Sequence, residues 1–559
     1  MIMSVFVVAR ILTVLSLISA ASSTGNDECT SSNSQCYSNQ SEPDSIFIEN
    51  DLEYNLNSIL KKQRQFYING SWVDPISGYN QDTIATPTLP VINPSTAKPI
   101  AHISLASRWD VNLAVQSSKE ALEKWSIHTT PQQRIRIIEV LLEKYRTHSV
   151  LMAQLITMEM GAPIDMSLSD QVGSGDYVIQ QFLEELERFE FEYPLGGTVD
   201  VDEPRTTIFM DPVGVVACIT PWNWPLNQIA LKVIPALATG NTVILKPSEL
   251  SPLSALLFTQ LLHEAGVPPG VFNLINGGGH SGAGEFLTTA VGVDMVSFTG
   301  STRAGAEISK AAADTFKRVS LELGGKGANI IFADAVVRPS SGSNDKDDDG
   351  YTLEEIIADG VYSCMENSGQ SCNAPTRMLV EESIYEEAVE IAARVAKSLR
   401  VDSGMERGDH LGPVVSQDQY DRIQGYIQKG LDEGARLVAG GLGQPANMRQ
   451  HAHSFGYYVQ PTVFADVLPT MTIARHEIFG PVLSILKFTT GVTRSATDEA
   501  IAMANDTPYG LANYVYSTDP ARLRKCARML RSGMVELNGV GLSGGSPFGG
   551  MKASGNGRE

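Results

Sequence analysis

One cysteine and one glutamate have the types and the setting for covalent chemistry. Cys372 ends the segment Asn-Ser-Gly-Gln-Ser-Cys (367–372), and Glu322 begins Glu-Leu-Gly-Gly-Lys (322–326). A thiolate adds readily to a carbonyl carbon, and a nearby carboxylate can deprotonate the water that later releases the product. Alone, such a cysteine is more often a small buried residue and such a glutamate a solvated charge. The pair therefore predicts a nucleophile and a base only if the rest of the chain supports it.

Further motifs follow apolar, strand-like runs. Asn223 lies in the turn Pro-Trp-Asn-Trp-Pro (221–225), after the run Val213–Ile219. Its amide can donate to an oxyanion, although turn asparagines are common next to proline. The other motifs are Lys-Pro-Ser-Glu (246–249), Phe-Thr-Gly-Ser-Thr-Arg-Ala-Gly (298–305) and Glu-Ile-Phe-Gly-Pro-Val (477–482). In this order, and from about Phe66 to the last residue, the chain resembles the NAD(P)-dependent aldehyde dehydrogenase superfamily.

The resemblance implies a fold and a reaction. The fold is α/β, of the aldehyde-dehydrogenase type, with a Rossmann-type cofactor domain, an α/β catalytic domain and a small β oligomerisation element. The reaction is NAD-dependent oxidation of an aldehyde to a carboxylic acid through a cysteine thiohemiacetal and a thioester. Cys372 would attack, Asn223 with the Cys372 backbone N–H would stabilise the oxyanion, and Glu322 would activate the hydrolytic water.

The resemblance also implies a cofactor site. Its residues are Trp222, Lys246, Glu249, Gly300, Ser301, Gly305, Glu477 and Phe479. Lys246 and Glu249 resemble adenosine-ribose ligands, and a carboxylate there would repel a 2′-phosphate, which favours NAD over NADP. The literal Gly-x-Gly-x-x-Gly pattern at 277–282 is a weaker signal, because the acid expected about twenty residues later is missing. Lys326 is either an electrostatic support for Glu322 or a capping or surface lysine.

Two alternative functions stay open at this point. In a CoA-acylating aldehyde dehydrogenase a thiol replaces water as the acyl acceptor, and the retention of Glu322 argues against it. The chain can also be a catalytically silent binding or structural homologue.

Composition limits the partners. The chain has 559 residues, 43% hydrophobic content and a net charge of −21, which disfavours nucleic acids and anionic membrane surfaces. We expect a small-molecule aldehyde as partner and no nucleic acid. Six cysteines in so long a chain make no disulfide framework, and only Cys29 and Cys36 are candidates for a pair.

The N-terminus differs from the rest. Arg10 precedes an apolar stretch from Ile11 to Ala21, so residues 1–22 resemble a secretory signal peptide; an organelle presequence and an uncleaved signal anchor, which would contact a membrane, stay open. Residues 23–64 have the composition of a disordered spacer. A secretory location conflicts with a free Cys372 thiol, which favours a reducing compartment.

Periodicity predicts the organisation of the body. Helical patterns cover 110–125 and 131–159, and strand-like and helical runs then alternate from 213 to 299, which predicts a parallel sheet covered by helices. We assign 65–195 and 212–321 to the NAD-binding domain, 196–211 to the oligomerisation hairpin and 322–545 to the catalytic domain. Residues 546–559 resemble a truncated C-terminal segment without the family's last strand. A homo-oligomer is expected if that strand is present.

An acidic insertion at 338–350 departs from the family spacing. Asp345, Asp347 and Asp349 match the first half of a calcium-binding EF-hand loop, but Ile356 occupies the position that needs a bidentate glutamate. We therefore expect no metal site, and instead a capping box of Thr352 and Glu355 for the following helix.

Overall fold

The computed structural model describes residues 56–76, 87–195, 206–336, 351–450, 455–489 and 494–559. The signal-like leader, Cys29, Cys36 and the acidic insertion lie outside the described residues. Residues 56–64, which the sequence assigned to the spacer, belong to the fold: residues 56–61 are helical and Ile59 is fully buried. The spacer prediction is therefore wrong for these residues, because an apolar contact outweighs their polar composition.

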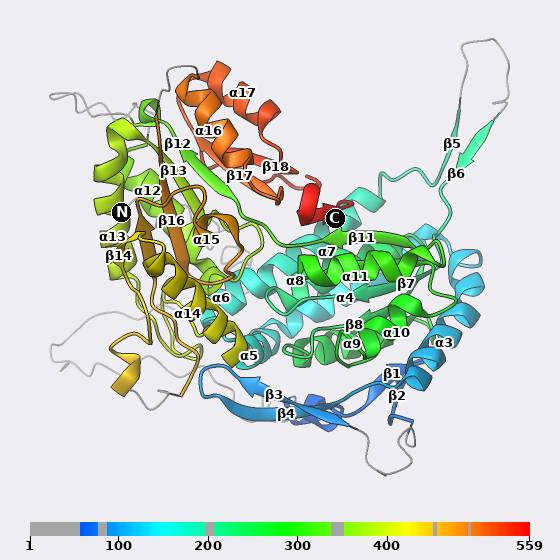
Figure 1. The fold of residues 1–559 in the computed structure, drawn as a ribbon. Coiled ribbons are helices and arrows are strands. Elements are labelled where there is room, and N and C mark those ends of the chain that lie inside the picture. The colour runs from blue at the N-terminus through cyan, green and yellow to red at the C-terminus, as the bar shows by residue number, and fades with distance from the viewer. Residues whose placement is uncertain (1–55, 77–86, 196–205, 337–350, 451–454, 490–493) are drawn as a thin grey trace, which may run out of the picture. The chain divides into compact units, whose positions relative to one another are not determined.

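The first sheet has eight strands in the order β19-β11-β10-β7-β8-β9-β1-β2 (Figure 1). The strands β7 to β11 are mutually parallel, whereas β1 and β19 run antiparallel to them and β2 pairs antiparallel with β1. The strand bounds are β1 Phe66–Ile68, β2 Ser71–Val73, β7 Val215–Ile219, β8 Thr242–Lys246, β9 Phe272–Leu274, β10 Met295–Thr299, β11 Arg318–Glu322 and β19 Gly555–Asn556. The predicted alternation of strands and helices from 213 to 299 is confirmed.

Helices cover both faces of this sheet because successive side chains of its strands point to opposite sides. Val216 and Cys218 of β7 pack into the core with α8 and α9, whereas Val215 and Ala217 pack into the core with α3 and α10. β7 is apolar throughout, as expected for a central strand of a doubly covered parallel sheet. The helix bounds are α3 Arg108–Ser126, α8 Pro225–Ala238, α9 Leu253–Glu264, α10 Ala283–Thr289 and α11 Thr302–Ala313.

The second sheet has seven strands in the order β14-β15-β16-β13-β12-β17-β18. Its strands are β12 Ala328–Ile331, β13 Arg377–Glu381, β14 Arg436–Ala439, β15 Thr462–Ala465, β16 Val482–Phe488, β17 Ala512–Tyr516 and β18 Met534–Leu537. Its helices are α12 Leu353–Met365, α13 Tyr385–Ser398, α14 Gln417–Asp432, α15 Thr472–Arg475, α16 Ala496–Asn505 and α17 Pro520–Met529. The capping box predicted for α12 is confirmed, since Thr352 accepts from the Glu355 N–H and Glu355 accepts from the Thr352 N–H.

The helical pattern from 131 to 159 forms two helices instead of one. α4 (Pro131–Thr147) ends at His148, which has φ −104° and ψ 15°, and α5 (Ser149–Met160) begins after it. The backbone N–H of His148 still donates to the Lys144 carbonyl at 3.1 Å. The break turns the second half of the pattern, whose side chains are buried almost all round, into the core.

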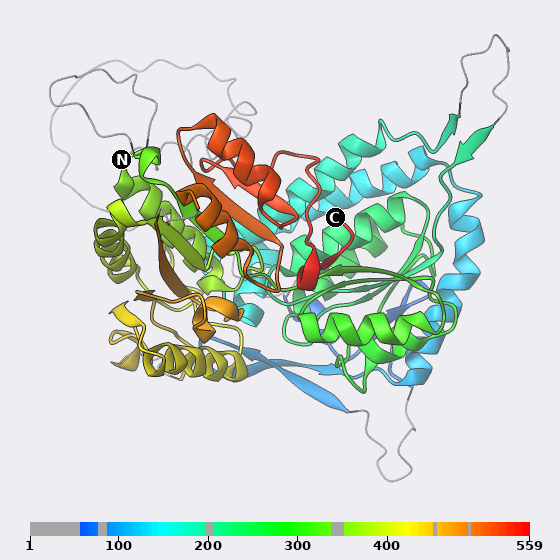
Figure 2. The same cartoon turned by 45° about the horizontal axis from the view of Figure 1, so that its top comes forward.

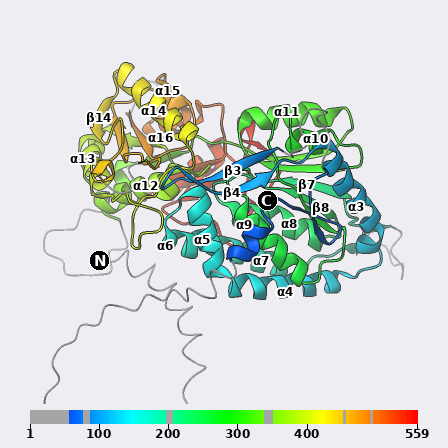
Figure 3. The same ribbon diagram turned by 90° about the horizontal axis from the view of Figure 1, so that it is seen from below.

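Two antiparallel pairs connect or extend these layers. The pair β3 (Thr88–Asn93) and β4 (Lys98–Ser104) lies beside α5 (Figure 3). The turn between the two strands contacts the segment before β15 of the second sheet, because Tyr457 donates its backbone N–H to the Pro94 carbonyl at 3.0 Å. The strands β5 (Glu192–Pro194) and β6 (Thr207–Phe209) pair with each other on either side of 196–205, residues that lie outside the described part. Among the helices of the described ranges, none combines the length and the apolar composition that a membrane span requires.

Candidate functional site

The carboxyl ends of the parallel strands gather most of the predicted residues at one edge of the first sheet. Trp222 and Asn223 follow β7, Lys246 ends β8, Gly300 and Ser301 follow β10, and Glu322 ends β11. Ligands of open parallel sheets bind at this edge. The topology therefore unites residues that lie as much as a hundred positions apart (322 − 222).

The loop that carries Cys372 (residues 367–373, the cysteine loop) comes to the same edge and is held by a hydrogen-bond network. The Asn223 amide donates to the Gln370 carbonyl at 2.9 Å, and the Trp224 indole donates to the Ser371 hydroxyl at 2.9 Å. Asn367, in the 3-10 turn η4 (Glu366–Gly369), donates to the Asn223 carbonyl at 2.9 Å. One amide hydrogen of Asn223 is thus used for positioning, and the second can serve a ligand.

A third amide was missed by the sequence reasoning. Gln171 also donates to the Asn223 carbonyl at 2.9 Å, and it lies in a π-helix (η2, Ser167–Val172) between α6 (Ile164–Met166) and α7 (Gly173–Leu186). Single π-turns of this kind are common at functional sites. No periodic pattern in the sequence marks it.

Cys372 is half-buried in this loop. Burial, followed by the nearby carboxylates of Glu477 and Glu322, raises the pKa of the Cys372 thiol to about 12. The backbone N–H groups of Cys372 and Asn373 act in the opposite direction by donating toward the sulfur. The protein alone therefore keeps the thiol protonated, and a positive charge at the site would be needed to form the thiolate at neutral pH.

Glu322 has the environment of a raised-pKa carboxyl group. It is 3% exposed, and neither of its carboxylate oxygens has a hydrogen-bond partner among the described residues. Burial and the charge of Glu559 raise the pKa of Glu322 to about 8, while Lys232 and Arg558 lower it. A carboxylate with that pKa is a stronger base than an ordinary glutamate.

The C-terminal segment supplies part of this environment. β19 pairs with β11, so that Gly555 lies opposite Glu322, and Figure 2 shows this red segment beside the first sheet. Glu559 forms a buried ion pair with Lys232 and accepts from the Ser297 hydroxyl at 3.1 Å. The sequence reasoning assigned no role to this segment, since the contact joins residues 327 positions apart.

Glu477 and Phe479 come to this edge from the segment between α15 and β16. The Glu477 carboxylate accepts from the Gly325 N–H at 2.9 Å, and a Cβ at Gly324 would come within 2.2 Å of it. The rings of Phe479 and Trp222 meet edge to face at 5.4 Å between centroids. Any side chain at position 324 would therefore force the Glu477 carboxylate to move.

The remaining predicted residues line the same edge. Lys246 contacts Glu249 at 3.3 Å and donates to the Pro247 carbonyl at 2.9 Å. Ser301 caps α11 by accepting from the Ala304 N–H at 3.3 Å. A Cβ at Gly305 would meet Leu323 at 2.6 Å, so this glycine packs against the segment after Glu322.

Lys326 is neither a surface nor a capping lysine. It is 2% exposed, and its amine has no hydrogen-bond partner among the described residues. Burial and the nearby Arg377 lower the pKa of Lys326 to about 7, while Cys364 and Glu477 raise it. The charged groups that act on Lys326 are Arg377 and Glu477 and do not include Glu322, so the interpretation of Lys326 as a support for Glu322 finds no contact in the structure.

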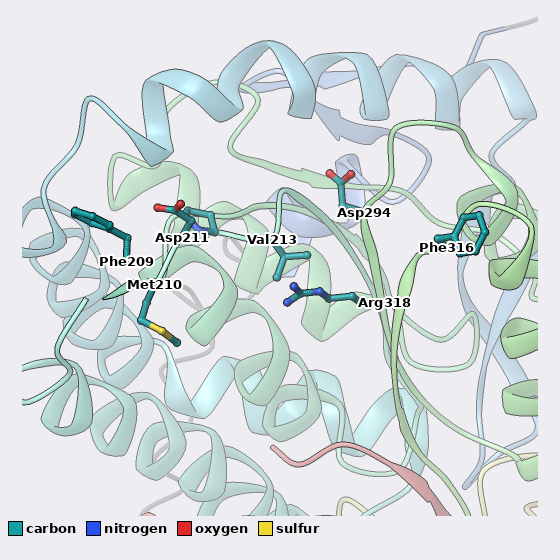
Figure 4. A pocket seen from close by; sticks show the side chains of 8 residues that line it. Phe209, Met210, Asp211, Val213, Asp294, Phe316 and Arg318 are labelled. Atoms are coloured by element: carbon teal, nitrogen blue, oxygen red, sulfur yellow. The ribbon is translucent and has the colours of Figure 1, made fainter. Parts of the chain in front are cut away.

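A pocket of about 490 Å³ lies elsewhere, at the amino ends of the strands (Figure 4). Met210, Val213, Asp294, Phe316 and Arg318 are among its lining residues, and none of the predicted site residues lines it. No group of three or more His, Cys, Asp or Glu residues suited to a metal ion occurs within the described ranges.

Comparison with known proteins agrees with this arrangement. The model of the aldehyde dehydrogenase family matches residues 81–342 and 345–559. A 3-succinoylsemialdehyde-pyridine dehydrogenase of Pseudomonas sp. is 43% identical over 503 residues, covering 89% of this chain and 96% of that protein. The crystal structure of an aldehyde dehydrogenase from Bartonella henselae is 50% identical with a TM-score of 0.80, covering 89% and 95% of the two chains. A mutant of aldehyde dehydrogenase C from Pseudomonas syringae, in complex with NAD+ and octanal, is 41% identical with a TM-score of 0.80, covering 89% and 93%.

Proposed function

The chain belongs to the aldehyde dehydrogenase family, and from this premise we propose that it oxidises an aldehyde to a carboxylic acid with NAD. The observation that carries the proposal is the meeting of the Cys372 loop with the carboxyl ends of β7 and β11, through Asn223 and Glu322. A thiol, an amide donor and a raised-pKa carboxylate at one sheet edge are the groups that acyl chemistry requires.

The residues at this edge fit NAD. The hydroxyls of Thr220 and Thr299 are buried there without a hydrogen-bond partner in the described part of the chain, as expected where a polar ligand binds. Lys246 and Glu249 would hold the adenosine ribose, and Glu477 the nicotinamide ribose. Trp222 and Phe479 would pack beside the ring, while Gly300, Ser301 and Gly305 would border the cofactor.

The chain's own residues account for the steps. The Cys372 sulfur bonds to the aldehyde carbon, and Asn223 with the Cys372 backbone N–H donates to the resulting oxyanion. When bound, NAD+ supplies a positive charge that favours the Cys372 thiolate and accepts the hydride lost from that carbon. Glu322 then takes a proton from water, whose oxygen attacks the thioester on Cys372. The acid leaves and the thiol is restored.

The test is NADH formation from NAD and acetaldehyde, followed by a panel of aldehydes of different length and charge. Cys372→Ala should abolish turnover and leave NAD binding, measured by calorimetry, intact. A wild-type protein that binds NAD and oxidises no aldehyde would instead support the silent homologue. Formation of an acyl-CoA thioester when CoA is added, in place of the free acid, would support the acylating enzyme, which the presence of Glu322 disfavours.

The proposal includes a homo-oligomer. In the described residues β5 and β6 pair only with each other and form a two-stranded ribbon. Phe209, at the end of β6, is 61% exposed. An isolated ribbon is marginally stable in water, so packing against a second copy would stabilise it. Sedimentation of the protein as a monomer at micromolar concentration would contradict this part of the proposal.

A further inference from the structure

Tyr514 contacts the peptide that follows the proposed nucleophile. It lies in β17, between Asn329 of β12 and Glu536 of β18. Its hydroxyl donates to the carbonyl oxygen of Asn373 at 2.8 Å. Its ring and the Cys372 side chain pack against the same small apolar cluster, which consists of Leu511, Ala512 and Met534.

The cysteine loop is otherwise held from its amino-terminal side. Asn223 fixes the Gln370 carbonyl, and Trp224 fixes the Ser371 hydroxyl. A Cβ at Gly325 would come within 2.2 Å of the Cys372 carbonyl oxygen, so the backbone packs closely there. Tyr514 provides a side-chain hydrogen bond on the carboxyl side of Cys372.

Tyr514 holds the backbone carbonyl of Asn373, and the backbone N–H of the same residue faces the Cys372 sulfur. The backbone N–H groups of Cys372 and Asn373 both favour the ionised thiol. If the Asn373 carbonyl loses its donor, one restraint on the orientation of this residue is removed, and the alignment of the N–H groups with the thiolate and the oxyanion is weakened.

We propose that Tyr514 is a positioning residue, which fixes the Asn373 peptide so that the Cys372 thiol and backbone N–H keep the geometry for attack on the aldehyde. This inference rests on the proposed function, because it takes Cys372 as the nucleophile. It concerns a residue of β17, whereas the cofactor residues come from the first sheet and from the 477–479 segment.

The phenol suits this role over the whole working pH range. Burial, followed by the charges of Glu536 and Cys372, raises the pKa of Tyr514 well above its usual value. The hydroxyl therefore keeps its proton and stays a donor where an ordinary acid or base would titrate.

Tyr516 provides a matched control. It lies two residues further on the same strand and therefore on the same face. Its hydroxyl donates to the Asp359 carboxylate at 2.8 Å, a contact with α12 instead of the cysteine loop. Tyr514→Phe and Tyr516→Phe each remove one phenolic hydroxyl and retain the ring.

The experiment compares both variants with the wild type in the full chain. We measure kcat, the KM for NAD, the melting temperature and the rate of Cys372 alkylation by iodoacetamide against pH. Tyr514→Phe should lower kcat about tenfold, as expected when a buried carbonyl loses its partner, and leave the KM for NAD unchanged. It should also move the alkylation profile to higher pH, whereas Tyr516→Phe should match the wild type in kcat and in alkylation.

Two results would overturn the inference. One is a Tyr514→Phe variant with wild-type kcat and a wild-type alkylation profile. The other is an equal loss of kcat and melting temperature in both variants, which would indicate a purely structural role. A wild-type protein without activity would refute the proposed function instead, and the alkylation profiles would still decide whether Tyr514 positions the thiol.

Discussion

The raised pKa of Glu322 predicts how turnover depends on pH. As a base, Glu322 must be ionised to take a proton from water, and its pKa is about 8. Roughly one Glu322 in eleven is then ionised at pH 7 and roughly ten in eleven at pH 9. For an aldehyde whose thioester hydrolysis limits the rate, kcat should therefore rise about tenfold between these pH values.

The assay must separate hydrolysis from the earlier steps, because the Cys372 thiol also titrates above neutral pH. Stopped-flow NADH absorbance gives a burst, which reports attack and hydride loss, and a steady phase, which reports hydrolysis. Glu322→Gln should retain a burst of about one NADH per site and slow the steady phase by about a hundredfold or more, with the pH dependence of that phase lost.

A different result would refute this reasoning. If the steady phase of the wild type is flat from pH 7 to 9 while a burst precedes it, Glu322 has an ordinary acidic pKa during hydrolysis. If Glu322→Gln keeps both the rate and the slope, another group is the base.

Two further predictions concern the cofactor side. Glu249→Gln should raise kcat/KM for NADP about tenfold relative to kcat/KM for NAD, because the Glu249 carboxylate, which is 34% exposed, would no longer repel a 2′-phosphate. An unchanged ratio, or a wild type that prefers NADP, would contradict the assignment of Glu249 to the adenosine ribose. Gly324→Ala should weaken NAD binding at least several-fold and spare the fold, because the new methyl group would lie only 2.2 Å from a Glu477 carboxylate oxygen and force that carboxylate to move. Calorimetry with NAD measures the affinity, and a wild-type value would show that Glu477 does not hold the cofactor.

The sequence was a good guide to the elements and a poor one to their contacts. The apolar run before Asn223 and the alternation after it predict parallel strands, and the carboxyl-edge rule then brings Asn223 and Glu322 together. The sequence does not predict the helix break at His148, because the periodicity continues through it. The hydrophobic periodicity of a segment predicts whether the segment is a helix or a strand, but it does not predict which other segments it contacts.

Residues of the site that depend on distant partners were missed for that reason. Gln171 and Asn223 are 52 positions apart, and Tyr514 and Asn373 are 141 apart. Lys326 follows two glycines and has the charge of a surface residue, yet it is only 2% exposed in the structure. Only the tertiary arrangement identifies Gln171 and Tyr514, and only it shows that Lys326 is buried.

The pairing of β19 with β11 has a consequence for partly folded states. It joins residues more than two hundred positions apart in sequence (555 − 322), so it closes a long loop and is expected to form late and to open early. Opening would give Glu322 water and remove it from Glu559, and its pKa would fall toward that of a solvated glutamate. The cysteine loop, which β19 does not hold, would stay in place. A molecule in this open state can still form the thioester, but its Glu322 would be a fully ionised and weaker base at neutral pH, so thioester hydrolysis in the open state would lose its dependence on pH between 7 and 9.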